Sequence, residues 1–92
     1  MKPASYEVYT MLLVEWLDIT QDSKWHNKAE MEKTRATKVK SIGFFLKNYV
    51  LDKKWVLKLA GSVTEDGDSD VLDIPFGCIN FIKEISVEYS DV

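Results

Sequence analysis

Apolar and polar residues alternate along several short stretches of the chain, and a period of two is typical of β-strands. Five stretches combine this pattern with β-branched and aromatic residues: residues 10–19, 36–49, 55–63, 71–74 and 79–87. Polar segments separate them, among them residues 51–54 and the EDGDSD stretch at residues 65–70, which is a strong hairpin signal. The pattern therefore predicts a mainly β protein of five strands.

Two details favour the curling of these strands into a barrel. Gly43 lies in the middle of the second predicted strand, where glycine usually marks a bulge or a sharp bend. Pro75 cannot continue a hydrogen-bonded ladder, so residues 75–78 predict a tight turn of the 3-10 type. We expect a small five-stranded SH3-like or Sm-like barrel. Asn27 and Glu30 can form a capping box, which predicts one short helix between the first two strands.

The length of 92 residues and the hydrophobic content of 46% fit one small domain. We expect a flexible N-terminal arm over residues 1–10, a single barrel domain over residues 11–88, and a frayed C-terminus over residues 89–92. A lone Cys78 cannot form an internal disulfide, which suits a reducing compartment. No signal-peptide pattern is visible and the apolar runs are short, so we expect a cytoplasmic protein without membrane contact.

Charge is segregated along the chain, although the formal net charge is only −3. Residues 1–23 carry −3, residues 24–60 carry +7 and residues 61–92 carry −7. The acidic total disfavours a protein that holds a long nucleic acid. The basic middle favours a small anionic ligand such as a nucleotide, unless the acidic ends neutralise it in the fold.

Short motifs follow one another between Leu12 and Ile85. They are VEWLD at residues 14–18, Trp25, VKSIGF at residues 39–44, LAGS at residues 59–62, EDG at residues 65–67 and IP at residues 74–75. In this order they resemble a set of small uncharacterised proteins of tailed bacteriophages and prophages. The resemblance implies a phage origin and expression in the cytoplasm of a bacterial host, and it implies no activity.

The residues that catalysis and metal binding require are scarce. The chain has one His and one Cys, His26 and Cys78, which are too few for a zinc site or a supported catalytic pair. The acidic residues at 66–70 have the spacing of the first calcium-loop ligands, but Val71 stands where that loop needs glycine. We therefore expect no catalytic residue, no metal site and no cofactor.

Two groups of residues are candidates for binding a ligand or a partner. The first group comes from the second and third predicted strands and consists of Lys38, Lys40, Phe45, Lys47 and Lys58. Ammonium groups beside aromatic rings suit phosphate contact and base stacking, provided that these strands pair. The second group is Trp25 with His26, which would line a pocket before the short helix. The structural alternatives are a solvated sheet face and a tryptophan that closes the end of the barrel.

Three functions from different classes follow. The first is a phage-type, non-enzymatic protein that docks on a host or phage protein, through a sheet edge or an aromatic patch, and modulates it. The second is an oligomeric module that binds or sequesters a nucleotide, because small barrels associate through exposed edges. The third is a structural or virion-associated component. An enzyme is the least favoured class.

Overall fold

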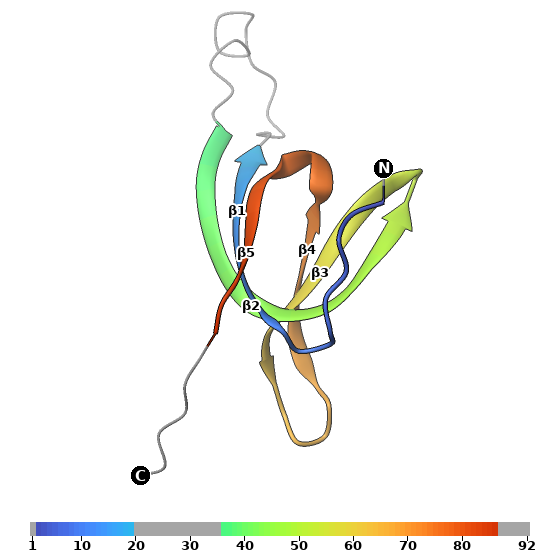
Figure 1. Cartoon of the computed structure of the whole chain (residues 1–92), viewed down its shortest axis with the longest axis vertical. Helices are drawn as coiled ribbons and strands as arrows, with labels where there is room; N and C mark the ends of the chain where they lie inside the picture. Colours follow the sequence, from blue (N-terminus) through green and yellow to red (C-terminus); the bar gives the residue numbers. More distant parts are fainter. Residues whose placement is uncertain (1, 20–35, 87–92) are drawn as a thin grey trace, which may run out of the picture.

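The computed structural model describes residues 2–19 and 36–86 of the chain. This part is mainly β and contains five strands and one short 3-10 turn (Figure 1). In chain order the elements are β1 (Met11–Ile19), β2 (Ala36–Leu51), β3 (Lys54–Val63), β4 (Ser69–Pro75), η1 (Phe76–Cys78) and β5 (Ile79–Glu84). The mainly β, five-stranded prediction is therefore confirmed. The predicted helix that starts near Asn27 lies outside the described residues.

The five strands form one antiparallel sheet in the order β4-β3-β2-β1-β5. The first strand therefore lies between the second and the last, and β4 and β5 are the two edges. No ladder joins β4 to β5 among the described residues, so the sheet is open and the expected barrel closure is not confirmed. Phe76, Ile79 and Ile82 pack against the core instead, so side-chain packing holds the turn between these two strands to the sheet.

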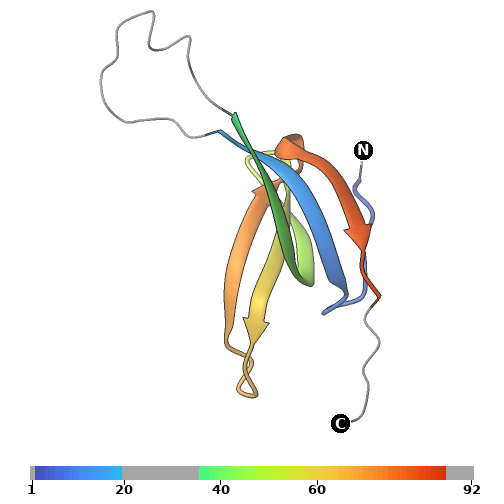
Figure 2. The ribbon, with the colours of Figure 1, turned by 90° about the vertical axis from the view of Figure 1, so that its left-hand side faces the viewer.

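The sheet curves because β2 bends in its middle. Its first half pairs with β1 up to Phe44, and its second half pairs with β3 from the same residue onward. The register with β3 shifts between Phe45 and Lys47, which is a β-bulge of the kind that bends a strand. As a result the half with β1 and β5 faces the half with β3 and β4 (Figure 2).

Gly43 lies at this bend, as the sequence predicted, and the reason is close backbone approach. A Cβ atom at Gly43 would lie 3.0 Å from the carbonyl oxygen of Ala60 and 3.1 Å from the Cβ of Leu59. Both atoms belong to β3 and cannot move away without shifting that strand. Glycine at this point lets β2 approach β3 where an added Cβ would crowd that strand.

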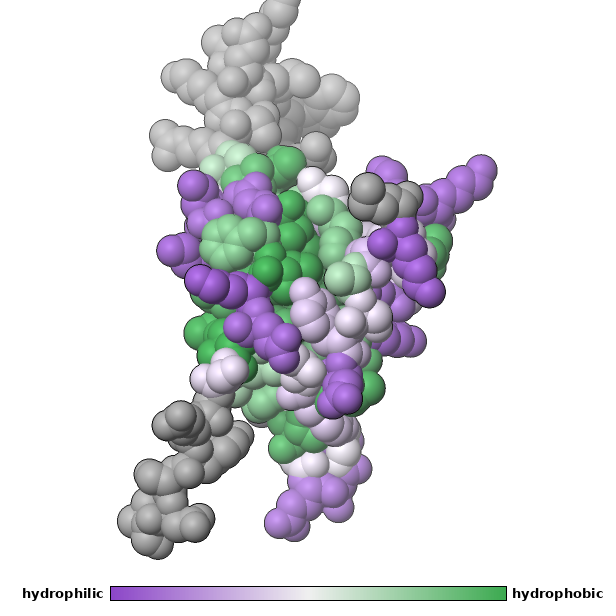
Figure 3. All heavy atoms as spheres, viewed as in Figure 1, coloured by the Kyte–Doolittle hydropathy of each residue, from purple (hydrophilic) through white to green (hydrophobic). Residues whose placement is uncertain are grey.

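The concave side of the sheet holds the core. Six buried residues form one cluster: Leu12, Val14, Phe45, Leu57, Leu59 and Ile74. They alternate along their strands with outward residues, as the period of two predicted. Leu72 points to the same side as Ile74 but stays 37% exposed, because β4 is an edge strand. In the space-filling view, hydrophilic residues gather at the tip of the β3–β4 hairpin (Figure 3).

Residues 2–10, expected as an arm outside the barrel, make several contacts with the second half of β2. The backbone N–H of Tyr9 donates to the carbonyl of Phe45 at 2.7 Å, and that of Phe45 donates to the carbonyl of Thr10 at 2.7 Å. The ring of Tyr6 packs edge-on against the ring of Phe45, with centroids 5.5 Å apart. These contacts lay the N-terminal segment along the sheet before β1 begins.

Replacing Gly43 with alanine tests the close approach at the bend. We expect Gly43→Ala to lower the free energy of unfolding by about 1–3 kcal/mol, because the added methyl group has no room. Gly77→Ala is the matched control, since nothing lies within 4 Å of its added Cβ, and it should change stability by less than about 0.5 kcal/mol. Urea unfolding measures both, and equal costs would contradict the account of the bend.

The turn between β2 and β3 is a position where the introduction of a glycine, rather than its removal, should raise stability. Asp52 and Lys53 form a two-residue hairpin loop, with positive φ angles of 49° and 64° that favour glycine. We expect Lys53→Gly to stabilise the protein by about 0.5–1 kcal/mol, because relief of backbone strain exceeds the entropy cost of glycine. Lys54→Gly, which replaces a strand residue, should destabilise it. Thermal unfolding of the two variants measures both effects, and shifts of the same sign would contradict this reading.

Candidate functional site

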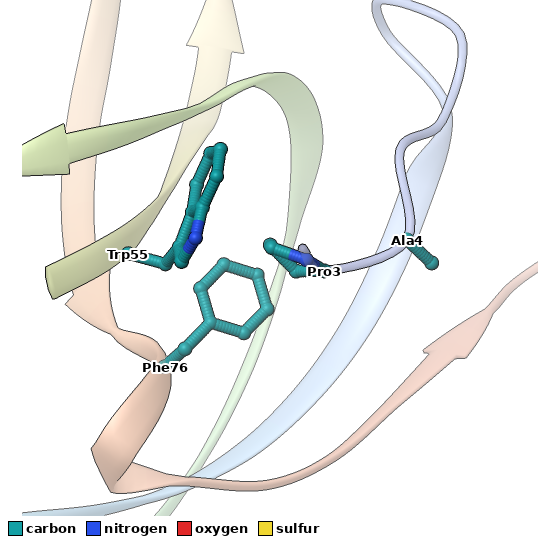
Figure 4. Close-up of a pocket in the computed structure, with 4 residues that line it drawn as sticks. All are labelled: Pro3, Ala4, Trp55 and Phe76. Carbon is teal, nitrogen blue, oxygen red and sulfur yellow. The ribbon is translucent and has the colours of Figure 1, made fainter. Parts of the chain in front are cut away.

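An apolar pocket opens on the concave side of the molecule, at the end opposite the β3–β4 hairpin. It has a volume of about 330 Å³ and is lined by Pro3, Ala4, Trp55 and Phe76. The rings of Trp55 and Phe76 converge on the ring of Pro3 from one side (Figure 4). Trp55 of β3 and Phe76 of η1 thus form one wall of the pocket, and Pro3 and Ala4 of the N-terminal segment form another.

The fold places the two aromatic rings through two turns. Trp55 is the second residue of β3, close to the β2–β3 turn, and shares the inward face with Leu57. Phe76 is the first residue of η1, where Pro75 ends β4. Because β3 pairs with β4 up to Pro75, the start of one strand and the end of the other meet at the same edge of the pocket.

Asn48 borders this site with a polar group. It lies on the inward face of β2, opposite Leu57, and its Nδ2 donates a hydrogen bond of 2.9 Å to the backbone carbonyl of Ala4. Its Oδ1 atom is buried and has no hydrogen-bond partner. An unsatisfied buried acceptor costs about 1–3 kcal/mol. Asn48 therefore holds the N-terminal segment through its amide nitrogen alone.

A second cluster lies on the convex side of the sheet. Lys47 and Lys58 face each other across β2 and β3, with their Nζ atoms 5.6 and 5.3 Å from the centre of the Tyr49 ring. Asp73 on β4 accepts a hydrogen bond of 3.0 Å from the Tyr49 hydroxyl and lies 3.7 Å from the Lys58 ammonium. A carboxylate thus already occupies the position where an anionic ligand would meet Lys58.

The pKa of Tyr49 is raised above its ordinary value of 10.0. Desolvation by burial is the largest cause, and the hydrogen bond to Asp73 and the negative charge of that carboxylate raise it further. All three causes favour the neutral phenol, which keeps its proton and donates a hydrogen bond to Asp73. The Tyr49 hydroxyl therefore stays protonated, and remains the hydrogen-bond donor to Asp73, well beyond neutral pH.

The structure separates the residues that the sequence grouped as candidates. The predicted pairing of the second and third strands is found, and it brings Lys47 and Lys58 together. Lys38 and Lys40 lie on the same convex side but in the other half of β2, opposite Leu17 and Glu15 of β1. Phe45 is a core residue with 3% of its surface exposed. Trp25 and His26 lie outside the described residues.

Two features of the sequence indicate the aromatic site, although the candidate group of lysines drew attention away from it. One is Asn48, a polar residue at an inward position of a largely apolar strand. The other is the position of Trp55 and Phe76 close to turn residues, where a large ring does not have to fill the centre of the core. The part played by Pro3 follows only from the path of the N-terminal segment, which carries no periodic pattern.

The remaining chemical candidates do not assemble into a site. Among residues 2–19 and 36–86, no three His, Cys, Asp or Glu side chains lie close enough to share a metal ion. The acidic hairpin tip is held by its own turn, in which the backbone N–H of Asp68 donates to the Thr64 hydroxyl at 3.1 Å. The side chain of Glu15 accepts a hydrogen bond of 3.3 Å from the amide of Asn80.

Comparison of the chain with models of known protein families, with curated proteins and with solved structures finds no match in any of the three. None of the helical structure in the described part of the chain is long and apolar enough to cross a membrane. Any proposal about function therefore rests on the geometry and the sequence motifs described above.

The convex cluster leads to a prediction about pH. Because the folded pKa of Tyr49 exceeds its unfolded value, its stabilising effect is complete below about pH 10 and is lost as the pH rises through the folded pKa. We expect Asp73→Asn to lower the pKa of Tyr49, and Tyr49→Phe to remove the tyrosine transition that lies above the ordinary value. Absorbance titration of the tyrosinates measures both, and an unchanged titration in Asp73→Asn would contradict the assigned cause.

Proposed function

We propose that the chain is a non-enzymatic protein-binding module that docks on a partner protein through the Trp55–Phe76 pocket and modulates that partner. The observation that supports this is the pocket itself, which is apolar, open and lined by Pro3 and Ala4 of the N-terminal segment as well as by the two aromatic rings. Aromatic rings at the centre of a protein interface commonly supply most of its binding energy. An adjacent amide that contacts the backbone of the segment would add orientation.

The proposal includes a finer description of the fold, an SH3-like or Sm-like barrel. Two features support it, the bend of β2 between two partner strands and the one-turn η1 before the last strand. A curved five-stranded sheet of this order is one hydrogen-bonded edge short of a closed barrel. The pocket would then lie at one end of the barrel, where small barrels often bind their ligands.

The proposed setting is the cytoplasm of a bacterium that carries a tailed phage or prophage, and the partner is a host or phage protein. The motifs between Leu12 and Ile85 support this setting. Exposed apolar residues support docking in general, since Ile42, Val50 and Leu51 are each more than half exposed.

A nucleotide-binding module is the second candidate function. The paired ammonium groups of Lys47 and Lys58 over Tyr49 favour it, because phosphate binds to such groups. Asp73 weighs against it, because a phosphate would have to displace that carboxylate from both Lys58 and the Tyr49 hydroxyl. The protein-binding proposal needs no such displacement of charge.

The experiment is a pull-down from bacterial lysate with the tagged protein and three variants. We expect the unchanged protein to retain one partner in a fixed ratio and Trp55→Ala to lose it. Truncation of a central aromatic residue costs about 2 kcal/mol or more of binding energy, which is a roughly thirtyfold loss of affinity. Phe76→Ala, which alters the pocket from η1, should have the same effect.

Ile42→Ala is the control, because Ile42 is 62% exposed on the convex side of the sheet, away from the pocket. It should retain the partner in full. Thermal unfolding of each variant confirms that it is folded. A partner that all four proteins retain equally would place the docking surface elsewhere, and a protein that melts higher with a nucleotide but retains no partner would favour the second function.

A further inference from the structure

Apolar side chains gather on the convex face of the half of the sheet that contains β1. This strand lies between the first half of β2 and β5 (Figure 2). Every second residue of β1 points away from the core, so Leu13 and Leu17 lie on the convex face. Ile42, which pairs with Leu13, is 62% exposed, and Phe81 of β5 is 41% exposed. Exposed apolar groups that share one face of a small protein often mark a surface that binds another molecule.

The ladder between β1 and β2 arranges this face in rows of two residues, one from each strand. On the convex side the register pairs Met11 with Phe44, Leu13 with Ile42, Glu15 with Lys40, and Leu17 with Lys38. We call these residues the outer β1–β2 face. Two apolar rows are thus followed by a row of opposite charges and then by a leucine beside a lysine.

The row of Glu15 and Lys40 makes the outer β1–β2 face complementary to itself. A two-fold axis that runs along the strands, midway between β1 and β2, lays β1 of one copy over β2 of another. Leu13 then meets Ile42 of the second copy, and Glu15 meets Lys40 of the second copy. The axis repeats each contact, so both charge pairs and both apolar pairs form twice.

Other two-fold arrangements of the same face lack this match. An axis along the centre of β1, or one across the strands through Glu15, sets the Glu15 carboxylates of the two copies against each other. An axis across the strands between Leu13 and Glu15 sets the carboxylate against a leucine. Like charges in contact and desolvated charges without a partner both cost binding energy. The charges therefore select one arrangement.

A neighbouring amide positions the Glu15 carboxylate for this contact. The Nδ2 atom of Asn80 donates a hydrogen bond of 3.3 Å to Oε2 of Glu15. An ionised carboxylate has about four acceptor sites, so it can also accept from an ammonium group. Lys40 is exposed, and its flexible stem lets the ammonium group reach across an interface. Asn80 thus orients the carboxylate without using up its capacity for a lysine.

We propose that the outer β1–β2 face binds a second copy of this chain and forms a two-fold dimer. The face measures about 25 Å along the strands and about 15 Å across them, or roughly 400 Å² on each copy. A standard interface buries about 800 Å² per partner, so the dimer is weak and forms at high concentration. The Trp55–Phe76 pocket opens on the concave side, so the dimer leaves it accessible on both copies.

Sedimentation equilibrium of the full chain tests the dimer. We expect the average mass to rise toward that of two chains between about 10 µM and about 1 mM protein. Ile42→Glu places a carboxylate against Leu13 of the second copy and should weaken association by about tenfold or more. Leu51→Glu is the matched control, because Leu51 is 58% exposed but lies at the far end of β2, and it should associate like the unchanged protein.

An exchange of charges tests the two-fold arrangement. Glu15→Lys alone sets two lysines together and Lys40→Glu alone sets two glutamates together, so each should associate about tenfold more weakly or worse. An equal mixture of the two variants should associate like the unchanged protein, because one copy then carries both lysines and the other both glutamates. The double variant should also regain association, and thermal unfolding confirms that each variant is folded.

The mass of a single chain at every concentration would overturn the proposal, and so would association that Ile42→Glu leaves unchanged. Association that is lost in both charge variants and not regained in their mixture would overturn the two-fold arrangement. These outcomes are independent of the proposed function, because the variants that test it change Trp55 and Phe76 on the opposite side of the sheet.

Discussion

The bend of β2 is the constraint on which the rest of the molecule depends. One strand serves two partners, β1 along its first half and β3 along its second, and the change occurs over the few residues from Gly43 to Lys47. The absent side chain of Gly43 lets β3 approach, and the bulge turns the strand. Without this bend the two halves of the sheet would not face each other, and the six core residues would have no common interior.

The bulge also decides which side chains share a face. Strict alternation from Lys38 and Lys40 would turn Lys47 toward the core, but the extra residue at the bulge returns it to the convex side, opposite Lys58. The same shift turns Asn48 inward, where it reaches the N-terminal segment. The charged cluster around Tyr49 and the aromatic pocket thus lie on opposite sides of one strand, because of one inserted residue.

Much of the fold can be predicted from the sequence, since period-two alternation gave the five strands, and Gly43, Pro75 and the acidic hairpin gave the bend and the turns. The site could not be predicted as well, because a bulge breaks the link between sequence spacing and face. Strict alternation puts Phe45 on the same face as Lys47, but the bulge between them separates the two, and Phe45 packs in the core against Tyr6. The pocket was missed because it joins residues 3 and 76, whose proximity no local pattern encodes.

The central claim is that the N-terminal segment forms one wall of the aromatic pocket, with Pro3 opposite Trp55 and Phe76. The most direct measurement is the proton spectrum of the full chain in solution, with cross-relaxation recorded from the Pro3 ring. The account predicts cross-peaks from Pro3 to the indole of Trp55 and the ring of Phe76, and shifts of the Pro3 signals caused by those rings. Pro3 signals at the positions of an unstructured peptide, with no cross-peak to either ring, would contradict it.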